Sequence, residues 1–279
     1  MAHHLATVTL IGNDKAGVIA RITQLLFQLG ANIEAMEEQV TRGQFSMTLL
    51  ASWTPARFDR AAIKREVRAV ADALAMEAKV HFALLGSQRL ALLVTKEPHV
   101  LEGLLAKSAK SLGAQPVVII GSRPDLEPVA HKAKLPFVHI PFTDRAKAER
   151  HVLQLLEHYE VDFIVLARFM KILSPNFVWH WKNKIINIHP SLLPSFPGAN
   201  AYRQAYERGV KVVGVTSHFV TPNLDEGPII AQEVLKVRPN EPLASIIKRG
   251  QKLETICTFR AVRAYVTKRL DVHWGRVYS

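Results

Sequence analysis

Hydrophobic and polar positions follow two different periods in the first third of the chain. Residues 6–12 (ATVTLIG) alternate with period two, which is typical of a half-buried strand. Apolar residues then recur at helical spacing from Val18 to Leu29, and Gly30 ends that run. The complete pattern predicts a ferredoxin-like βαββαβ sandwich, with strands at 6–12, 31–40, 45–53 and 78–84 and helices at 18–29 and 61–75.

The pattern changes after residue 85. Residues 86–89 (GSQR) are interpreted as a linker, and residues 90–94 form a wholly apolar run. Continuous apolar strands that alternate with amphipathic helices are typical of a parallel sheet covered on both faces. We therefore predict an α/β unit with a mostly parallel sheet, with strands at 90–94, 116–120, 137–140, 162–166, ending at 186, at 212–220 and from 229, and helices at 100–112, 124–134, 145–159, 202–209 and 242–270.

The composition is that of a globular protein large enough for two domains. The chain has 279 residues, of which 48% are hydrophobic and 22% charged. We assign residues 1–85 to a first domain, 86–89 to the linker and 90–279 to a second domain. No apolar run reaches membrane-spanning length and the N-terminus does not resemble a signal peptide, so we expect a soluble, cytoplasmic protein without a membrane partner. The single cysteine, Cys257, excludes an intrachain disulfide.

The net charge is strongly positive. The chain has 36 Lys and Arg against 24 Asp and Glu, a formal charge of +12 that attracts anions such as nucleic acid or an acidic small molecule. The basic residues are spread along the whole chain and form neither an arginine-rich arm nor an aromatic-basic platform. We therefore expect no nucleic acid partner and interpret the charge as a solvated surface or as steering for a polyanionic ligand.

Polar side chains follow the predicted strand that ends at residue 186. The segment 184–198 reads KIINIHPSLLPSFPG, and its three prolines restrict the backbone. Asn187 and His189 share a face, because side chains two apart in extended backbone point to the same side. Ligands of parallel sheets bind outside the carboxyl ends of the strands, which is where these two side chains are expected.

Two further polar side chains come from the next strand and loop. His218 lies within residues 212–220, and the loop after it contains Asp225 and Glu226. An amide that stabilises an oxyanion, an imidazole that moves protons and a carboxylate that activates water are the groups needed to attack a carbonyl carbon. The residues alone leave other interpretations open, with His218 as a core histidine and Asp225 as a turn carboxylate.

Two other chemistries are disfavoured. Ser191 follows His189 closely but lacks the Gly-x-Ser-x-Gly pattern of a nucleophile. A metal site built from His189, His218 and Asp225 is conceivable, but the chain has no His-Glu-x-x-His or comparable pair. We predict no metal and no tightly bound cofactor.

The first domain resembles the ACT domains, small regulatory modules that commonly bind amino acids at dimer interfaces. The matching segments are the turn at 9–18 (TLIGNDKAGV) and the helix end at 29–33 (LGANI), although the glycines alone would also be explained by a turn and a helix stop. The resemblance implies an amino-acid effector and a homo-oligomer, either a dimer or a larger assembly. The implied effector site is near Asn13, Asp14, Gly17 and Asn32.

The second domain resembles the catalytic domain of the 10-formyltetrahydrofolate-dependent formyltransferases. The blocks 187–194 (NIHPSLLP) and 224–230 (LDEGPII) carry the resemblance together with His218, and segments 167–175 and 202–209 also match, so that it covers residues 89–279. It implies a Rossmann-like fold with Asn187, His189 and Asp225 as a catalytic trio and His218 as a supporting residue. It also implies a folate pocket lined by Met170, Ile172, Leu173, Val220 and Leu224.

The trio does not identify the formyl acceptor, because transferases and hydrolases of this kind share it. Glycinamide ribonucleotide transformylases have a glycine-rich phosphate loop after the first strand, whereas residues 94–100 (VTKEPHV) contain no glycine, and Glu97 would repel a phosphate. Methionyl-tRNA formyltransferases add a C-terminal barrel, for which residues after 242 are too few. An ACT-like module before a formyltransferase-like domain is the architecture of formyltetrahydrofolate deformylases, whose acceptor is water.

We therefore predict hydrolysis of 10-formyltetrahydrofolate to tetrahydrofolate and formate, a reaction of one-carbon metabolism. Asn187 and protonated His189 would stabilise the oxyanion, and Asp225, with His218 nearby, would deprotonate the water. One departure favours a formyltransferase with an amine acceptor: deformylases carry a second histidine followed by Ser-Phe-Leu-Pro, whereas residues 190–194 here read PSLLP. An inactive folate- or amino-acid-sensing protein is the third interpretation.

Overall fold

The computed structural model describes residues 4–41, 43–82, 87–267, 270–273 and 275–278. The chain divides into two units, residues 1–85 and 86–279, and each unit is described by itself. Among the described residues, no helix combines the length and the apolar character that crossing a membrane requires.

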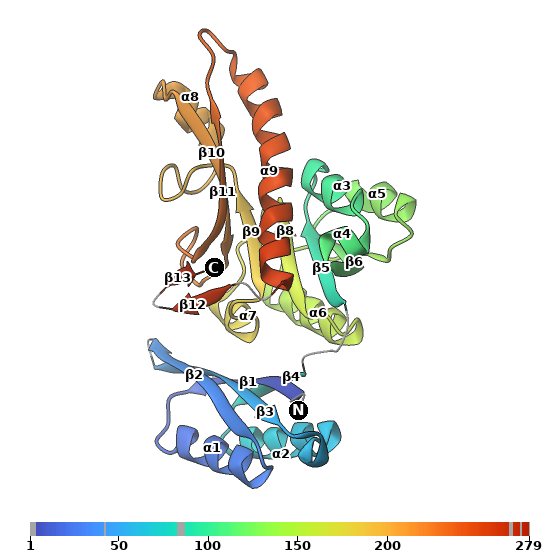
Figure 1. The fold of residues 1–279 in the computed structure, drawn as a ribbon, viewed down its shortest axis with the longest axis vertical. Coiled ribbons are helices and arrows are strands. Elements are labelled where there is room, and N and C mark those ends of the chain that lie inside the picture. The colour runs from blue at the N-terminus through green and yellow to red at the C-terminus, as the bar shows by residue number, and fades with distance from the viewer. Residues whose placement is uncertain (1–3, 42, 83–86, 268–269, 274, 279) are drawn as a thin grey trace. The chain divides into compact units, whose positions relative to one another are not determined.

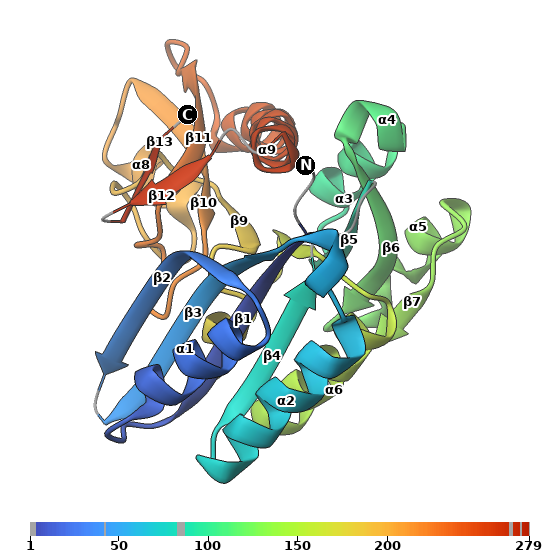
Figure 2. The same cartoon turned by 60° about the horizontal axis from the view of Figure 1, so that its bottom comes forward.

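The first unit is an antiparallel sheet with two helices on one face (Figure 2). Alternate residues of the central strands, such as Val8 and Leu49, are fully buried, and they pack in one core with Ile22 and Ile63 of the two helices. This is the predicted ferredoxin-like arrangement, which is thereby confirmed. The sheet order is β2-β3-β1-β4, and the elements are β1 (His4–Asn13), α1 (Val18–Gln28), β2 (Asn32–Thr41), β3 (Gln44–Trp53), η1 (Pro55–Arg57), α2 (Arg60–Ala73) and β4 (Glu77–Phe82).

The second unit contains a larger sheet with the strand order β11-β10-β9-β8-β5-β6-β7. The neighbours from β9 to β7 are parallel, whereas β10 runs antiparallel to both β9 and β11. The predicted mostly parallel sheet is confirmed. Its strands are β5 (Gln88–Val94), β6 (Ala114–Gly121), β7 (Phe137–His139), β8 (Phe163–Ala167), β9 (Ile185–His189), β10 (Val212–Phe219) and β11 (Ile229–Lys236).

Helices cover both faces of this sheet, which explains why its strands are apolar throughout. Leu90 and Leu92 of β5 pack in one core, and Ala91 and Leu93 pack in the other. We call the first side the α9 face, after the long helix that runs along it in Figure 1, and the second the α6 face. The α9 face carries α3 (His99–Leu105), η2 (Pro124–Leu126), α5 (Glu127–Lys132), α8 (Ala201–Glu207) and α9 (Leu243–Val266), and the α6 face carries α6 (Arg145–His158) and α7 (Pro175–His180).

The predicted linker is wrong in its second half, because β5 begins at Gln88. The Arg89 N–H donates to Asp162 Oδ2 over 2.6 Å, and the Asp162 N–H donates to the Arg89 carbonyl over 2.8 Å. This pair of hydrogen bonds joins Arg89 to the segment that enters β8, and no pattern within residues 86–89 predicts it. Leu84 of the predicted fourth strand and Gly86 of the predicted linker lie outside the described residues.

Three predicted helices differ from the structure in extent. The one at 100–112 is two helices, α3 and α4 (Ala109–Leu112), because Ser108 is extended and its hydroxyl accepts from the Ser111 N–H over 3.1 Å as a new cap. The one at 124–134 begins as the 3-10 turn η2, and α9 ends at Val266 instead of residue 270. The hairpin of β12 (Asp271–His273) and β13 (Arg276–Tyr278) was missed, because three-residue strands are too short to show an alternation.

The contact between α3 and α9 is close enough to test by substitution. A Cβ on Gly103 would lie 2.1 Å from Thr255 Cγ2. Alanine is better than glycine in an open helix by about 1 kcal/mol, but overpacking costs about 1–3 kcal/mol. We therefore expect Gly103→Ala to lower the free energy of unfolding, measured in urea. In a Thr255→Ala background the same substitution should be neutral or stabilising, and equal losses in both backgrounds would contradict this packing.

Candidate active site

Asn187 and His189 lie on the α6 face at the carboxyl end of β9. The strand continues to His189 instead of ending at Ile186 as predicted, so both side chains belong to the strand itself. Ile186 and Ile188 pack in the core of the α9 face, which turns the alternate side chains to the opposite face. Asn187 and His189 therefore point to the same side, as their spacing predicts.

His218 lies beside Asn187 because β10 pairs with β9 in antiparallel register. The His218 Nδ1 lies 2.9 Å from the Phe219 carbonyl, so Nδ1 donates and Nε2 is free to accept. The Asn187 Nδ2 lies 3.2 Å from that Nε2 and donates to it. Burial lowers the pKa of His218, which favours this neutral form. The contact uses one N–H of the Asn187 amide and leaves the second N–H for a ligand.

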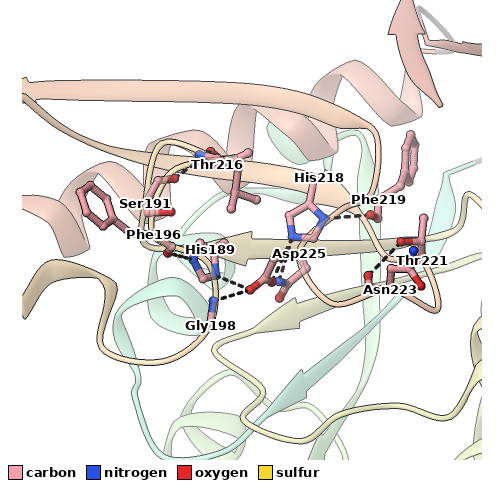
Figure 3. A network of polar contacts seen from close by, with 12 residues as sticks. His189, Ser191, Phe196, Gly198, Thr216, His218, Phe219, Thr221, Asn223 and Asp225 are labelled. Atoms are coloured by element: carbon pink, nitrogen blue, oxygen red, sulfur yellow. Dashed lines mark hydrogen bonds and ion pairs between the residues drawn. The ribbon is translucent and has the colours of Figure 1, made fainter. Parts of the chain in front are cut away.

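Asp225 reaches the same place from the loop after β10 (Figure 3). Its Oδ2 accepts from the Gly198 N–H over 2.9 Å and lies 3.3 Å from His189 Nδ1, while its Oδ1 lies 3.8 Å from His218 Nε2. The side chains of Asp225, His189 and His218 are all buried. The structure therefore brings the four residues predicted for catalysis together, with Asp225 beside both histidines and Asn187 in contact with His218.

The second nitrogen of His189 is also engaged. His189 Nε2 lies 3.0 Å from the Phe196 carbonyl, on the loop that follows β9. Both ring nitrogens thus face oxygen acceptors, and only the imidazolium can donate to both at once. These surroundings suit a histidine that takes up a proton and gives it away.

The loop at 190–198 is held by the neighbouring strands. The Thr216 hydroxyl donates to the Ser191 carbonyl over 2.8 Å and accepts from the Leu193 N–H over 3.0 Å. The Gln232 amide donates to the Leu193 carbonyl over 3.0 Å. The Ser191 hydroxyl donates to the Ser195 carbonyl within this loop, so it serves the loop and does not face the carboxylate as a nucleophile.

The loop that carries Asp225 has an unusual backbone conformation and a close contact between main-chain atoms. Asp225 itself has a φ of 57°, in the left-handed region, and a Cβ on Gly227 would lie 1.7 Å from the Phe219 carbonyl oxygen. The neighbouring carboxylate, Glu226, is exposed and accepts from the Asn223 amide. The turn therefore directs Asp225, and not Glu226, towards the histidines. Within the described ranges, no three His, Cys, Asp or Glu side chains are arranged to hold a metal ion.

The five residues predicted for the folate pocket separate into two groups. Met170, Ile172 and Leu224 are exposed, by 55%, 63% and 56%, which is unusual for large apolar side chains and typical of a ligand surface. Leu173 is buried in the core of the α6 face and Val220 packs against that core. The first three side chains are thus open to solvent, whereas the last two are packed in or against the core of the α6 face.

The sequence did not predict that a second set of polar side chains would come together. The ion cluster, as we call it, consists of Glu97, His99, Arg168, Tyr202 and Glu254. His99 Nε2 lies 2.8 Å from Glu254 Oε2, and the Tyr202 hydroxyl donates to Glu254 Oε1 over 2.8 Å. Burial, together with the Glu254 charge, raises the pKa of Tyr202. Arg168 lies 3.5 Å from Glu97 and 3.6 Å from Glu254. No local spacing could have joined positions 99 and 254, because 155 residues separate them.

The residues predicted for an effector site are not all brought together. Asn13 ends β1 opposite Gln44, whereas Asn32 begins β2 opposite Ser52. Eight residues of β3 therefore separate them, about 26 Å in a strand. The prediction that Asn32 shares a site with the 13–17 turn is wrong within one chain. Asp14 and Gly17 lie exposed in that turn, and the Asn32 amide donates to Glu34.

Comparisons with known proteins agree on both units. A model of the formyl transferase family matches residues 88–262, and a model of the ACT domain matches residues 4–81. A formyltetrahydrofolate deformylase from Bacillus subtilis (strain 168) is 36% identical over 266 residues, which cover 93% of this chain and 88% of that protein.

Solved structures give the same result. A formyltetrahydrofolate deformylase from Pseudomonas syringae pv. tomato is similar with a TM-score of 0.67 and 29% identity, covering 100% of this chain and 94% of that one. A glycinamide ribonucleotide transformylase from Symbiobacterium toebii is similar with a TM-score of 0.66 and 33% identity, covering 70% of this chain and 97% of that one.

The lowered pKa of His218 predicts a pH dependence of stability. The unfolded histidine titrates near pH 6.5, and the folded one titrates lower because burial disfavours its charge. The stabilisation is present above about pH 6.5 and is lost as the pH falls through the folded pKa, because the unfolded chain then binds the proton more readily. His218→Gln should make the free energy of unfolding fall less steeply between about pH 7 and 5. His131→Gln, at an exposed histidine, should leave the slope unchanged; equal slopes in all three proteins would contradict the assignment.

Proposed function

The chain belongs to the formyltetrahydrofolate deformylases, enzymes of the formyl transferase fold with an N-terminal ACT domain, and on this premise we propose that it hydrolyses 10-formyltetrahydrofolate to tetrahydrofolate and formate. The observation that carries the proposal is that the Asp225 carboxylate lies beside His189 and His218, and that His218 in turn accepts from the Asn187 amide. These side chains supply an oxyanion donor, a proton carrier and a base, the groups that hydrolysis of an N-formyl bond requires.

In the proposed reaction a water oxygen attacks the formyl carbon, and the bond between that carbon and N10 of the folate then breaks. The Asn187 amide donates to the oxyanion that forms on the formyl oxygen, and the His189 imidazolium does so once one of its N–H groups leaves its present acceptor, the Phe196 carbonyl or the Asp225 carboxylate. One such donor lowers the barrier by about 3 kcal/mol. His189 gives its proton to the departing N10. The Asp225 carboxyl group, which took a proton from the attacking water, then returns that proton to His189.

Asp225 is the base in this scheme because its two oxygens have different surroundings. Oδ2 already accepts from the Gly198 N–H and faces His189. Oδ1 lies 3.8 Å from His218 Nε2, too far for a direct hydrogen bond, so this oxygen is left to accept from a water molecule. We therefore assign the attacking water to Oδ1. His218 orients the Asn187 amide, so that its role is to position the oxyanion donor.

The substrate has an apolar part and an anionic part. We assign the pteridine to the exposed side chains of Met170, Ile172 and Leu224, with Leu173 and Val220 packed beneath their loops. The glutamate tail is an anion, and the formal charge of +12 favours its approach. The substrate 10-formyltetrahydrofolate carries the reacting group itself, so the proposed reaction needs no further organic cofactor.

Transfer of the formyl group to an amine is the second candidate. Pro190 and Leu192 favour it, and so does the similarity to a glycinamide ribonucleotide transformylase. Residues 94–100 favour hydrolysis, because they contain no glycine and present Glu97, whose carboxylate lies 3.5 Å from Arg168.

The ACT domain suggests a small-molecule effector. We further propose that this effector is an amino acid bound near the turn from Asn13 to Gly17, that the chain forms a dimer or a larger homo-oligomer, and that it works in the cytoplasm. The turn supports the first point because Asn13, Asp14 and Gly17 are exposed and close in the chain, with the backbone of Gly17 at a φ of 86°.

Formate release tests the main proposal. Purified protein should release formate from 10-formyltetrahydrofolate without an added amine, and turnover that requires glycinamide ribonucleotide would favour the transferase instead. Asp225→Asn should lower kcat by about 10²–10⁴-fold, because it removes the base, while folate binding changes little. Glu226→Gln, at the exposed neighbouring carboxylate, is the matched control and should keep its activity. Normal turnover by Asp225→Asn would exclude the role given to Asp225.

Calorimetric titration with glycine, methionine and serine tests the effector. We expect one of them to bind, and we expect Asn13→Ala to weaken that binding at least tenfold by removing a polar contact at the turn. Asn32→Ala, in β2 opposite the far end of β3, should bind as the native protein does. Absence of heat with all three amino acids, or equal effects of the two variants, would exclude this effector site.

A further inference from the structure

The ion cluster borders the catalytic groups at the carboxyl edge of the sheet. β8 lies between β5 and β9, with Val94 paired to Ala167 and Leu166 paired to Asn187. Arg168 follows β8 two residues after Leu166, as His189 follows Asn187. Arg168 therefore leaves the sheet at the level of His189, just after the neighbouring strand, and its left-handed backbone, with a φ of 61°, breaks the alternation that would otherwise place it on the α6 face with Leu166.

The cluster lies on the side of the sheet opposite to the folate surface. Glu254 comes from α9 and Tyr202 from α8, the helices of the α9 face. Leu173 lies in the core of the α6 face, and His189 points to the same face because Ile188 beside it packs on the other. In the proposed complex a folate over the α6 face presents its formyl group at the edge, so that an acceptor too large for the water position at Asp225 Oδ1 would extend over the ion cluster.

The charges of the cluster leave no cation for a negatively charged ligand. The Arg168 guanidinium is shared between two carboxylates, 3.5 Å from Glu97 and 3.6 Å from Glu254. Glu254 is 1% exposed and already accepts from Tyr202. Glu97 is 31% exposed and presents its charge to anything that approaches. An anion brought here would meet a carboxylate before it met a free donor.

Water is compatible with the same arrangement. His99 Nδ1 and Arg168 Nε are buried and make no hydrogen bond to a described residue. His99 Nδ1 lies 3.9 Å from Glu97 Oε2 and Arg168 Nε lies 3.6 Å from Glu254 Oε2, too far for direct hydrogen bonds, so that each atom lacks a partner that a bound water would supply. The cluster thus offers polar atoms that can bind a small neutral molecule, and its carboxylates repel an anion.

We propose that the ion cluster selects the formyl acceptor: it admits water and excludes amines that carry a phosphate. The inference rests on the proposed function and extends it to acceptor specificity. Glu97 and Glu254 are the specificity-determining residues, and His99, Arg168 and Tyr202 hold them in place. The fold itself does not exclude such an acceptor, since a glycinamide ribonucleotide transformylase has a similar structure.

Calorimetric titration of the full-length protein with glycinamide ribonucleotide tests the proposal. The native protein should bind it weakly, and Glu97→Gln should bind it at least tenfold more tightly, because the substitution keeps the size and removes the charge. Glu102→Gln, at an exposed carboxylate of α3, the short helix that follows Glu97, is the matched control and should bind like the native protein. The dephosphorylated glycinamide riboside should not distinguish the three proteins, since it lacks the anion.

A second variant and a second measurement complete the test. The same titration with glycinamide ribonucleotide is made on Glu254→Gln, at the buried carboxylate, and thermal melting verifies that each variant is folded. Tight binding of glycinamide ribonucleotide by the native protein, or equal affinities of folded Glu97→Gln and Glu102→Gln, would overturn the proposal. Formate release is measured separately. If the native protein releases none, the hydrolase proposal fails, whereas a tenfold gain in affinity by Glu97→Gln still supports exclusion of anions by the cluster.

Discussion

The pairing of β9 with β10 is the constraint on which the candidate site depends. Because β10 runs against its parallel neighbours, His218 comes to lie beside Asn187 with its side chain on the same face. The same direction carries the chain away from the carboxyl edge, so the loop after β10 must fold back across the α6 face to deliver Asp225. The left-handed backbone of Asp225 and the close approach of Gly227 to Phe219 are the local consequences of that return.

Main-chain groups, more than side chains, hold these residues in position. Each histidine is anchored on a carbonyl, His189 on that of Phe196 and His218 on that of Phe219. The carboxylate of Asp225 is anchored on the Gly198 N–H. A donor or base contributes to catalysis only when it already occupies the productive geometry, and backbone anchors on strands and short loops provide this without ordering further side chains.

Features with a short period were predictable from the sequence, and features built by distant segments were not. The common face of Asn187 and His189 follows from their spacing, and the place of Asp225 came only from a resemblance between motifs. Asn32 was misplaced because the fold of a hairpin decides which end of a strand a residue reaches. The contact of His99 with Glu254 joins the start of the second unit to its last long helix, and neither segment shows a pattern that requires the other.

The similarity of this fold to hydrolases and transferases alike means that the backbone alone does not set the acceptor. We place the difference in side chains at the carboxyl edge, on the α9 face, which the proposed folate site leaves open. There the chain buries Glu254 and makes it share one guanidinium with Glu97, an arrangement that costs desolvation and adds little to stability. Charged groups kept under such conditions at a ligand edge are explained by the reaction better than by the fold, because apolar packing in their place would stabilise the protein at least as well.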